Sequence, residues 1–447
     1  MTQSDILNNI KSRLGIVQLN PMQEAIAQDS SKVHDYVLYS PTGTGKTLAY
    51  AISMLSNIDE AATGRLQALV IAPSRELALQ IGQVVREIAA GVKVTCLYGG
   101  HSALDEKRSL SDVPAILVAT PGRLLDHVQR GNVDLGSVRQ VVIDEFDKCL
   151  ELGFEGEMKQ LCHKIPRQAR HILTSATALD AIPAYTGITS PKIYNFVQGG
   201  NSPRNRMKIY RVISQSKDKI ETLKQLLTAL PGERTIVFAN YREAVDRIYQ
   251  HLKASHLPVG LYHGALDQIE REKALAMLAN GTFQILVTTD LGARGLDIEG
   301  VKNIVHYHLP ISAEAFTHRN GRTARIDASG NIYVLLGPDE VVPDYIHFDS
   351  TCNLKHFTPS SSETAPAAMA TVYFKAGKKE KISKGDILGF IANKGGLTAS
   401  EIGKINVYDH YALAAVPATK AEAVITKLKA NKIKGKKVLI SQAKQNQ

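Results

Sequence analysis

Short apolar runs alternate with helix-length stretches between residues 33 and 200. The runs are almost continuously apolar, which is typical of parallel strands that are buried on both faces. Strands are predicted at residues 37–39, 68–71, 92–97, 115–118, 141–143 and 171–173. The pattern predicts a parallel sheet with helices on both faces.

The same pattern begins again after residues 195–210, which are rich in Gly, Asn, Ser and Arg and are predicted to be a linker. Apolar runs at residues 235–238, 259–262, 285–287, 304–305 and 332–336 predict a second α/β sheet. Residues 358–368, with Ser, Thr and Pro, are predicted to lie in a second linker.

The last segment has a different order of elements. Strands are predicted at residues 372–375, 402–408, 411–416 and 438–441. Helices capped by Ser383 and Thr419 are predicted to end near residues 393 and 430, and Asp409 and His410 are predicted to form a hairpin turn. The order β-α-β-β-α-β is that of an RNA-recognition-type sandwich.

We therefore predict an α/β protein with two parallel-sheet domains, followed by a small α+β domain of the RNA-recognition type. The predicted boundaries are 1–200 and 201–345 for the sheets, 346–370 for a linker and 371–447 for the small domain. A length of 447 residues by itself predicts two or three domains.

The net charge of +10 is confined to one end of the chain. Residues 371–447, called the tail below, hold 15 Lys against 5 acidic residues, whereas the preceding 370 residues hold 38 basic and 38 acidic residues. A segment with this bias is a candidate for binding nucleic acid. The alternative is a solvated, Lys-rich surface that serves solubility.

Neither a membrane segment nor a disulfide framework is expected. No apolar run reaches about 18 residues, and the N-terminus lacks the regions of a signal peptide. The four cysteines, Cys96, Cys149, Cys162 and Cys352, show no CxxC spacing. A cytoplasmic location in a reducing environment is predicted.

A loop suited to hold phosphates follows the first predicted strand: Ser40, Pro41, Thr42, Gly43, Thr44, Gly45, Lys46 and Thr47. Its glycines let backbone N–H groups face phosphate oxygens, and the N-terminus of the next helix adds positive potential. Lys46 is expected to contact the β- and γ-phosphates, and the Thr47 hydroxyl is expected to bind Mg²⁺.

Asp144 and Glu145 follow the apolar run at residues 141–143. Acidic side chains at the carboxyl end of a parallel strand lie where ligands bind. Asp144 is expected to hold Mg²⁺, and Glu145 is expected to orient or deprotonate the attacking water. Together with the phosphate loop, this pair predicts hydrolysis of a nucleoside triphosphate.

Residues 318–325 are basic and lie in the second α/β unit. Arginines delivered from a second domain can stabilise the charge that develops on the transferred phosphoryl group. We expect Arg322 and Arg325 to serve in this way, so that hydrolysis depends on closure of the two units. A basic helical face without such a role is the alternative.

These motifs, in this order, resemble the DEAD-box RNA helicases of superfamily 2, and the resemblance covers roughly residues 5–345. It implies two RecA-like domains, with ATP and Mg²⁺ as cofactors. It also implies nucleotide contacts from Gln23, Asp147, Gly295 and Asp297, a catalytic position for His318, and coupling of hydrolysis to closure through Ser175 and Thr177.

The resemblance also implies a set of RNA contacts, most of them to the phosphate backbone: Pro73, Arg75, Gly99, Gly100, Thr120, Pro121, Gly122, Arg123, Asn240, Gln268, Arg271, Thr289 and Asp290. Contacts of this kind position a strand without recognising its sequence.

Three departures from the family pattern stand out. Phe146 replaces the family's Ala, at a position that is not expected to bind metal, so we expect activity with altered local packing. Ser40 replaces the usual Ala. Ile16 stands where the family has an aromatic residue beside the adenine, so the preference for ATP is expected to depend chiefly on Gln23.

The tail resembles the C-terminal RNA-binding domain of the bacterial DbpA subfamily at residues 387–389, 402–405 and 432–436. That resemblance implies ribosomal RNA as the partner and a role in large-subunit assembly. Lys434, Lys436 and Lys437 are expected to contact RNA phosphates. For Tyr408 and Tyr411, which flank the predicted hairpin turn, we favour packing over base stacking.

The leading hypothesis is an ATP-dependent RNA helicase, acting as a monomer without a membrane partner on structured ribosomal RNA, with a hairpin bound by the tail. Two alternatives stay open at this point. One is a DNA-directed translocase of the same superfamily, and the other is a nucleotide-gated RNA clamp that holds RNA without unwinding it.

Overall fold

The computed structural model describes residues 2–41, 43–100, 103–177, 179, 181–197, 206–230, 232–290, 298, 300–323, 329–354 and 367–445. The described residues up to 197 form one unit, and those from 206 onward form a second unit that includes the tail.

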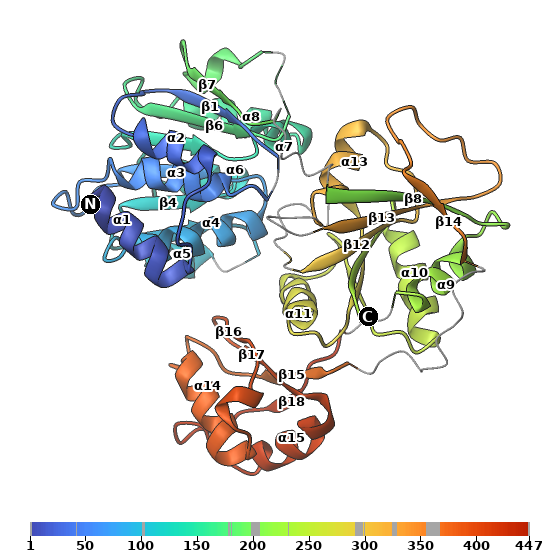
Figure 1. Cartoon of the computed structure of the whole chain (residues 1–447). Helices are drawn as coiled ribbons and strands as arrows, with labels where there is room; N and C mark the ends of the chain where they lie inside the picture. Colours follow the sequence, from blue (N-terminus) through green and yellow to red (C-terminus); the bar gives the residue numbers. More distant parts are fainter. Residues whose placement is uncertain are drawn as a thin grey trace. The chain divides into compact units, whose positions relative to one another are not determined.

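The first unit is a seven-stranded sheet in which all paired strands are parallel (Figure 1). The strands are β1 (Tyr36–Tyr39), β2 (Ala68–Ile71), β3 (Val94–Leu97), β4 (Ile116–Ala119), β5 (Gln140–Ile143), β6 (Arg170–Ser175) and β7 (Lys192–Asn195), in the order β3-β4-β2-β5-β6-β1-β7. The helices are α1 (Gln3–Asn9), α2 (Pro21–Gln28), α3 (Lys46–Leu55), α4 (Arg75–Ile88), α5 (Ala103–Leu110), α6 (Pro121–Gln129), α7 (Phe146–Glu151) and α8 (Glu155–Cys162).

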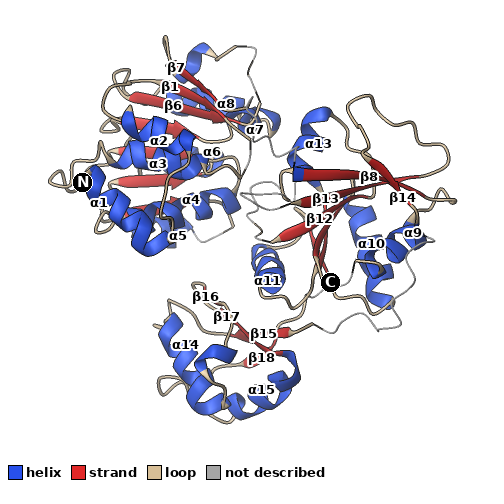
Figure 2. Ribbon diagram, viewed as in Figure 1, coloured by secondary structure: helices blue, strands red, loops and turns tan. Residues whose placement is uncertain are grey.

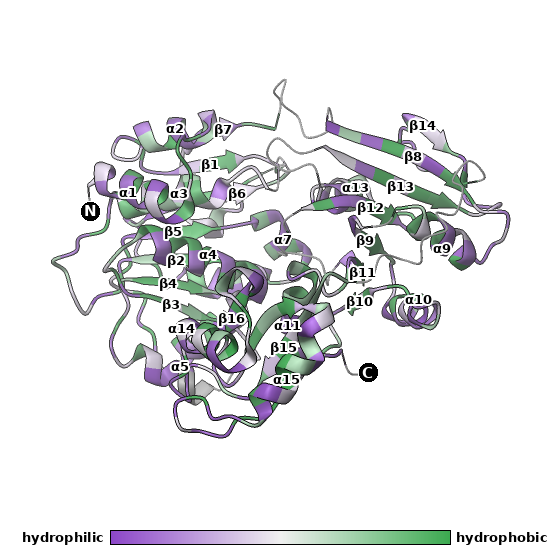
Figure 3. Cartoon of the chain, turned by 60° about the horizontal axis from the view of Figure 1, so that its bottom comes forward, coloured by the Kyte–Doolittle hydropathy of each residue, from purple (hydrophilic) through white to green (hydrophobic). Residues whose placement is uncertain are grey.

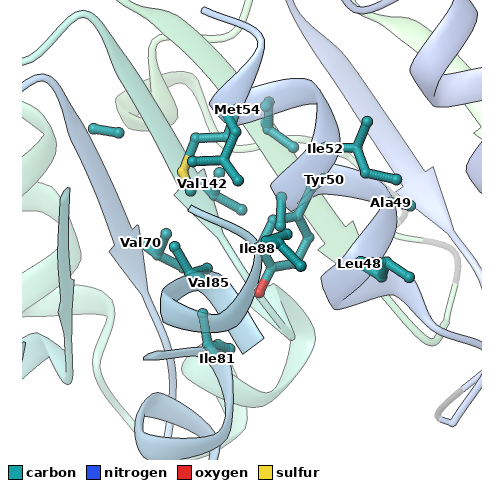
Figure 4. Packing of buried hydrophobic residues seen from close by; sticks show 14 of the residues in the cluster. Leu48, Ala49, Tyr50, Ile52, Met54, Val70, Ile81, Val85, Ile88 and Val142 are labelled. Carbon is teal, nitrogen blue, oxygen red and sulfur yellow. The ribbon is translucent and has the colours of Figure 1, made fainter. Parts of the chain in front are cut away.

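Successive residues of the central strands belong to two different apolar layers. Leu38, Val70 and Val142 pack against α3 and α4 on one face, as Figure 4 shows for Val70 and Val142. Their neighbours Val37 and Ile71 pack with residues of α6, α7 and α8 on the other face. Because both faces of these central strands are buried, their sequences are apolar almost throughout, and Figure 3 colours them mostly as hydrophobic.

The second unit begins with another parallel sheet flanked by helices (Figure 2). Its strands are β8 (Met207–Ile213), β9 (Arg234–Phe238), β10 (Val259–Tyr262), β11 (Ile285–Thr288), β12 (Val301–His306), β13 (Gly330–Leu336) and β14 (Ser350–Cys352), in the order β10-β11-β9-β12-β13-β8-β14. Its described helices are α9 (Ile220–Thr228), α10 (Arg242–Ala254), α11 (Gln268–Ala279) and α13 (Ala313–Asn320).

The tail forms an antiparallel sheet in the order β16-β17-β15-β18. Its elements are β15 (Met369–Phe374), α14 (Lys384–Phe390), β16 (Ile405–Val407), β17 (Ala412–Pro417), α15 (Ala421–Lys429) and β18 (Ile440–Gln442). Ser383 caps α14 with a reciprocal pair of hydrogen bonds to Asp386. The predicted fold class, two parallel-sheet domains followed by a small α+β domain, is confirmed.

Some local predictions are wrong. Residues 192–195 and 207–213 form β7 and β8, so both ends of the predicted linker 195–210 belong to strands. In β7 only Tyr194 is buried, and β8 alternates between buried and more exposed residues, so a search for continuously apolar runs misses both strands. Similarly, β14 and the start of β15 lie within residues 346–370. Thr419 does not cap α15, because a 3₁₀ turn at Ala418–Lys420 precedes that helix.

Gly377→Ala is expected to destabilise the tail by roughly 1–3 kcal/mol, since a Cβ there would overlap fixed backbone atoms. It would lie 2.2 Å from the carbonyl oxygen of Tyr408 and 2.6 Å from that of Asp409. Gly385→Ala is the matched control, because its nearest neighbour atom is Ser383 Oγ at 3.9 Å. Hydrogen exchange of tail amides in the full chain measures both effects. Equal protection in the two variants would contradict the prediction.

Candidate ATP site and RNA-contact edges

Apart from Gln23, which lies on α2, the predicted nucleotide and RNA motifs of the first unit follow the carboxyl ends of its parallel strands. In an open parallel sheet these ends form one edge, where ligands bind. The nucleotide motifs follow β1, β5 and β6, which are neighbours in the strand order. The RNA motifs follow β2, β3 and β4, which are also neighbours. The two candidate sites therefore occupy adjoining parts of the same edge.

The phosphate loop turns directly into α3. Gly45 has a φ of 89°, and a Cβ there would lie 2.4 Å from Nε2 of Gln23, so only glycine fits. Lys46 is buried, and its Nζ donates to the carbonyl oxygens of Ser40 (2.6 Å) and Pro41 (3.4 Å). The ammonium is thus held inside the loop that is suited to receive phosphates.

Gln23 ties the predicted adenine-binding segment to this loop. Its Oε1 accepts from the backbone N–H of Asn20 (3.0 Å), and its Nε2 donates to the carbonyl oxygen of Gly45 (3.3 Å). Asn20 Nδ2 also donates to the carbonyl oxygen of Thr44 (3.0 Å). The hydroxyls of Ser40 and Thr44 are 2.7 Å apart, so the serine at position 40 adds a bond within the loop.

The carboxylate of Asp144 is buried and held at both oxygens. The hydroxyl of Tyr50, on α3, donates to Oδ2 (2.9 Å), and the hydroxyl of Thr174, on β6, donates to Oδ1. Burial, together with the adjacent Asp144, raises the pKa of Tyr50 well above its ordinary value, so Tyr50 stays a proton donor. Hydrogen bonds from two elements, α3 and β6, therefore fix the orientation of this carboxylate.

Glu145 occupies a strained position between β5 and α7. Its φ of 47° lies in the left-handed region, which non-glycine residues rarely adopt. Its backbone N–H donates to Asp144 Oδ1 (3.1 Å) and to Thr174 Oγ1 (3.2 Å), which hold this conformation. Strain of this kind is concentrated at functional sites.

Ser175 and Thr177 connect the end of β6 to the acidic motif. The backbone N–H of Thr177 donates to Ser175 Oγ (3.2 Å), and the Thr177 hydroxyl donates to Asp147 Oδ2 (3.2 Å). Asp147 Oδ1 is buried without a hydrogen-bond partner among the residues that the structure describes. An unpaired buried acceptor is unfavourable, which makes Asp147 a candidate for contact with a ligand.

Phe146, which replaces the family's Ala, packs in the hydrophobic core. Its side chain is fully buried, and its ring centroid lies 6.5 Å from that of Tyr185. The ring belongs to the apolar layer that α7 and α8 share with the sheet. The aromatic replacement therefore acts on packing and not on the oxygen atoms around Asp144.

The predicted RNA residues of the first unit are ordered by local contacts. A Cβ at Gly99 would lie 3.1 Å from the Arg75 guanidinium, so these two motifs lie against each other. Arg123 Nε is 2.5 Å from Glu106 Oε2, and Glu106 also accepts from the backbone N–H of Tyr98 (3.2 Å). Gly100, with a φ of 95°, follows β3, while Pro73 follows β2 and Thr120, Pro121 and Gly122 follow β4.

In the second unit, a buried arginine binds two of the predicted RNA residues, Asn240 and Asp290. Arg319 is 1% exposed, and it donates to both carboxylate oxygens of Asp290 (2.6 Å each) and to Oδ1 of Asn240 (2.7 Å). It also donates to the carbonyl oxygen of His308 (2.8 Å). A buried charge needs such partners, so Arg319 fixes the carboxyl ends of β9, β11 and β12 relative to one another.

Three family models match successive parts of the chain. They describe a DEAD/DEAH box helicase at residues 20–182, a helicase conserved C-terminal domain at residues 218–327 and a DbpA RNA binding domain at residues 371–442. The ATP-dependent RNA helicase DbpA of Escherichia coli is 34% identical over 95% of this chain and 94% of its own length.

The chain belongs to the DEAD-box family of ATP-dependent RNA helicases. DbpA of Bacillus subtilis is 29% identical over 98% of this chain and 97% of its own length. A variant of S. cerevisiae Dbp5 solved with RNA and ADP BeF3 matches with a TM-score of 0.68 and 25% identity, over 75% of this chain and 88% of that one. Mss116p bound to ssRNA and AMP-PNP matches with a TM-score of 0.66 and 26% identity, over 75% of this chain and 72% of that one.

The helicase is thus an RNA-dependent ATPase that uses ATP, and the DNA-directed alternative is not retained. Its carboxylate and hydroxyl oxygens at Asp144 and Thr47 are hard donors that suit Mg²⁺. Thr42, Gly295, Asp297 and Arg325 lie outside the described residues. Arg322 is buried and His318 is half-buried, both at or just after the end of α13.

The tail of the helicase places its predicted RNA contacts on a tight turn, where Lys434 has a φ of 48° and Gly435 a φ of 76°. Lys434 Nζ lies 2.8 Å from Asp386 Oδ2, and this bond contributes most to lowering the pKa of that carboxyl to about 2. Lys436 Nζ donates to the carbonyl oxygen of Glu380 (3.1 Å). Lys437 is exposed. Lys434 is therefore partly neutralised within the tail.

The preference for packing by the hairpin tyrosines agrees with their positions. Tyr408 and Tyr411 stack with centroids 4.5 Å apart, and Tyr411 is only 5% exposed.

Sequence reasoning missed four residues that hold others in place: Tyr50, Glu106, Thr174 and Arg319. Arg319 lies inside the segment 318–325, but its burial could not be deduced from a basic string. The other three act through hydrogen bonds between different helices, strands and loops, and no spacing rule indicates these.

His306 is neutral because its two nitrogens have different partners. Nε2 lies 2.9 Å from Asn320 Oδ1, which can only accept, and Nδ1 lies 3.3 Å from Arg319 Nη1, which can only donate. Burial, with Arg319 beside the ring, lowers the pKa of His306 from about 6.5 to about 3.

Lowering the pH from about 7.5 to about 5 is expected to destabilise the second unit. The unfolded chain protonates His306 near pH 6.5, whereas the folded chain keeps it neutral to about pH 3. The contribution is complete above pH 6.5 and falls by about 1.4 kcal/mol per pH unit below it. Urea unfolding of wild type and His306→Asn over this range measures the slope. Asparagine keeps an acceptor for Arg319 and does not titrate, so equal slopes would contradict the assignment.

Proposed function

We propose that this helicase remodels ribosomal RNA during assembly of the large subunit, with the tail binding an RNA hairpin. The observation that carries the proposal is that the whole excess charge of +10 lies in a domain matched by the DbpA RNA-binding model. The core supplies the ATP-driven activity. The tail selects the RNA target.

Lys46 and the N-terminus of α3 hold the β- and γ-phosphates of ATP. Thr47 and Asp144 would hold Mg²⁺, which would supply positive charge beside the phosphates when bound. Glu145 orients the attacking water and takes its proton. The neighbouring Asp144 carboxylate is held in a fixed orientation by Tyr50 and Thr174.

Hydrolysis depends on RNA because the two α/β domains contribute complementary groups. Arg322 and Arg325 reach the γ-phosphate when the domains close on a bound strand, and His318 acts beside them. Ser175 and Thr177 pass this change to Asp147, to which Thr177 is hydrogen-bonded. An arginine delivered in this way contributes on the order of 10³–10⁵ in rate.

The RNA contacts of the core do not distinguish sequences. Arg75 and Arg123, and the backbone N–H groups near Gly99 and Gly100, suit phosphate oxygens. Asn240 and Asp290, fixed by Arg319, face the same strand from the second domain. Gripping one strand from both domains bends it and displaces its partner locally.

The tail binds RNA through its lysine turn. Lys434 and Lys436 donate to the carbonyl oxygens of Lys381 and Glu380, so the turn lies against a second lysine-containing loop. Because Asp386 offsets Lys434, we assign the larger share of phosphate binding to Lys436 and Lys437.

The helicase is proposed to act as a cytoplasmic monomer, because one chain carries both the ATP and the RNA motifs. Among the described residues, no helix combines the length and apolar character needed to cross a bilayer.

Replacing Lys434, Lys436 and Lys437 together by Gln is expected to weaken binding of a ribosomal RNA hairpin and to flatten its salt dependence. The slope of log affinity against log salt should fall by about 0.7–0.9 for each phosphate that the variant no longer neutralises. Fluorescence anisotropy at several salt concentrations measures this. The matched control replaces Lys427 and Lys429, which are exposed on α15.

Removal of residues 371–447 should abolish the preference for the hairpin while ATPase stimulation by generic RNA persists at high concentration. Equal selectivity of the truncated and intact chains would contradict the proposed selection of the RNA target by the tail.

A further inference from the structure

One face of the tail's sheet is buried although no helix of the tail covers it. Val372, Phe374 and Ala412 pack under α14 and α15. Residues one position along each strand point the opposite way. On that opposite face, Thr371 and Leu413 are fully buried. Another part of the second unit must therefore cover it.

The covering element is α11 of the second α/β domain with the turn that follows it. The hydroxyl of Tyr411 donates to Oε2 of Glu272. The ammonium of Lys273 lies 5.2 Å from the ring centroid of Tyr373. The hydroxyls of Thr371 and Thr282 are 2.7 Å apart. Burial, with Glu272 alongside, raises the pKa of the Tyr411 hydroxyl, which keeps it a donor.

The end of the chain adds a second attachment. The side-chain amide of Gln445 accepts from the backbone N–H of Leu261 and donates to its carbonyl oxygen, both at 2.9 Å. Leu261 lies on β10, an edge strand of the second sheet. The tail thus occupies backbone groups that an edge strand otherwise leaves open.

Glu272 is shared between the tail and a predicted RNA contact of the core. Its Oε2 accepts from Tyr411, and its Oε1 accepts from Nε2 of Gln268 (2.8 Å), one helical turn earlier. Glu272 is only 8% exposed. Arg271, the other predicted RNA contact of this helix, precedes it directly. One buried carboxylate therefore links the docked tail to the RNA-contact end of α11.

We propose that docking of the tail on α11, through the sheet face that carries Tyr373 and Tyr411, raises the affinity of the core for RNA. Glu272 is the positioning residue between Tyr411 and Gln268. This inference rests on the RNA-contact role of Gln268 under the proposed function. The tail then does more than select the RNA target, since a docked tail orders Gln268 of the core for contact with any RNA strand.

The physical basis is the restricted freedom of the Gln268 side chain. A carboxylate can only accept, so it must be met by the NH₂ end of the Gln268 amide, which fixes how that amide is turned. The bond from Tyr411 fixes the carboxylate in turn. Without the tyrosine hydroxyl, the Glu272 carboxylate can rotate and no longer fixes Gln268. The entropy cost of ordering the Gln268 side chain then lowers the affinity for RNA.

Tyr411→Phe tests the link in the full chain, with polyuridylate as a probe that offers the tail no hairpin. The concentration of polyuridylate that half-maximally stimulates ATP turnover should rise roughly 2- to 10-fold, as expected for one net hydrogen bond. Turnover at saturating RNA and RNA-free turnover should stay unchanged. Tyr373→Phe is the matched control, because it removes a hydroxyl of the same face and keeps the ring beside Lys273.

A double-mutant cycle with Gln268→Ala distinguishes positioning from general destabilisation. In the Gln268→Ala background, Tyr411→Phe should have no further effect on half-saturation. Additive effects, or a Tyr411→Phe protein with wild-type half-saturation, would overturn the inference while leaving the proposed function intact. If Gln268→Ala alone binds polyuridylate like wild type, the RNA-contact role itself is wrong, and the link through it is wrong as well.

Discussion

The fixed carboxylate of Asp144 is the constraint on which the ATP site depends. It is buried between α3, which begins at the phosphate loop, and β6, which ends at Ser175, and each contributes one hydroxyl to it. Because Thr174 also accepts from the backbone of Glu145, the same bonds hold that residue in its strained conformation. Phosphate loop, acidic motif and coupling motif are therefore a single hydrogen-bonded assembly at the edge of one sheet.

In the second α/β domain, a buried charge holds the residues at the strand ends in place. Arg319 satisfies its own burial by bonding to Asp290 and Asn240, and so orders groups from neighbouring strand ends. The neighbouring His306 stays neutral because it accepts from that guanidinium. In the same domain, α11 carries Gln268 at its start and the tail contact Glu272 one turn later. RNA contacts and the docked tail are thus supported by one helix.

Much of this could be predicted from the sequence, because apolar runs and ordered motifs are local. The central strands and the motif residues after them follow directly from such patterns. β7 and β8 were missed because many of their residues are exposed, and a search for continuous apolar runs does not detect such strands. Tyr50, Thr174 and Glu272 were missed for another reason. Their roles come from hydrogen bonds that exist only once distant elements pack together.

The most direct test of the account is RNA-stimulated ATP turnover by Glu145→Gln, with ATP binding measured on the same protein. Glutamine keeps the size of the side chain and cannot take a proton from water. ATP affinity should stay like that of wild type, and turnover should fall by at least about 10²-fold, as for loss of a general base. Turnover like that of wild type would contradict the assignment of the hydrolytic site to this strand end.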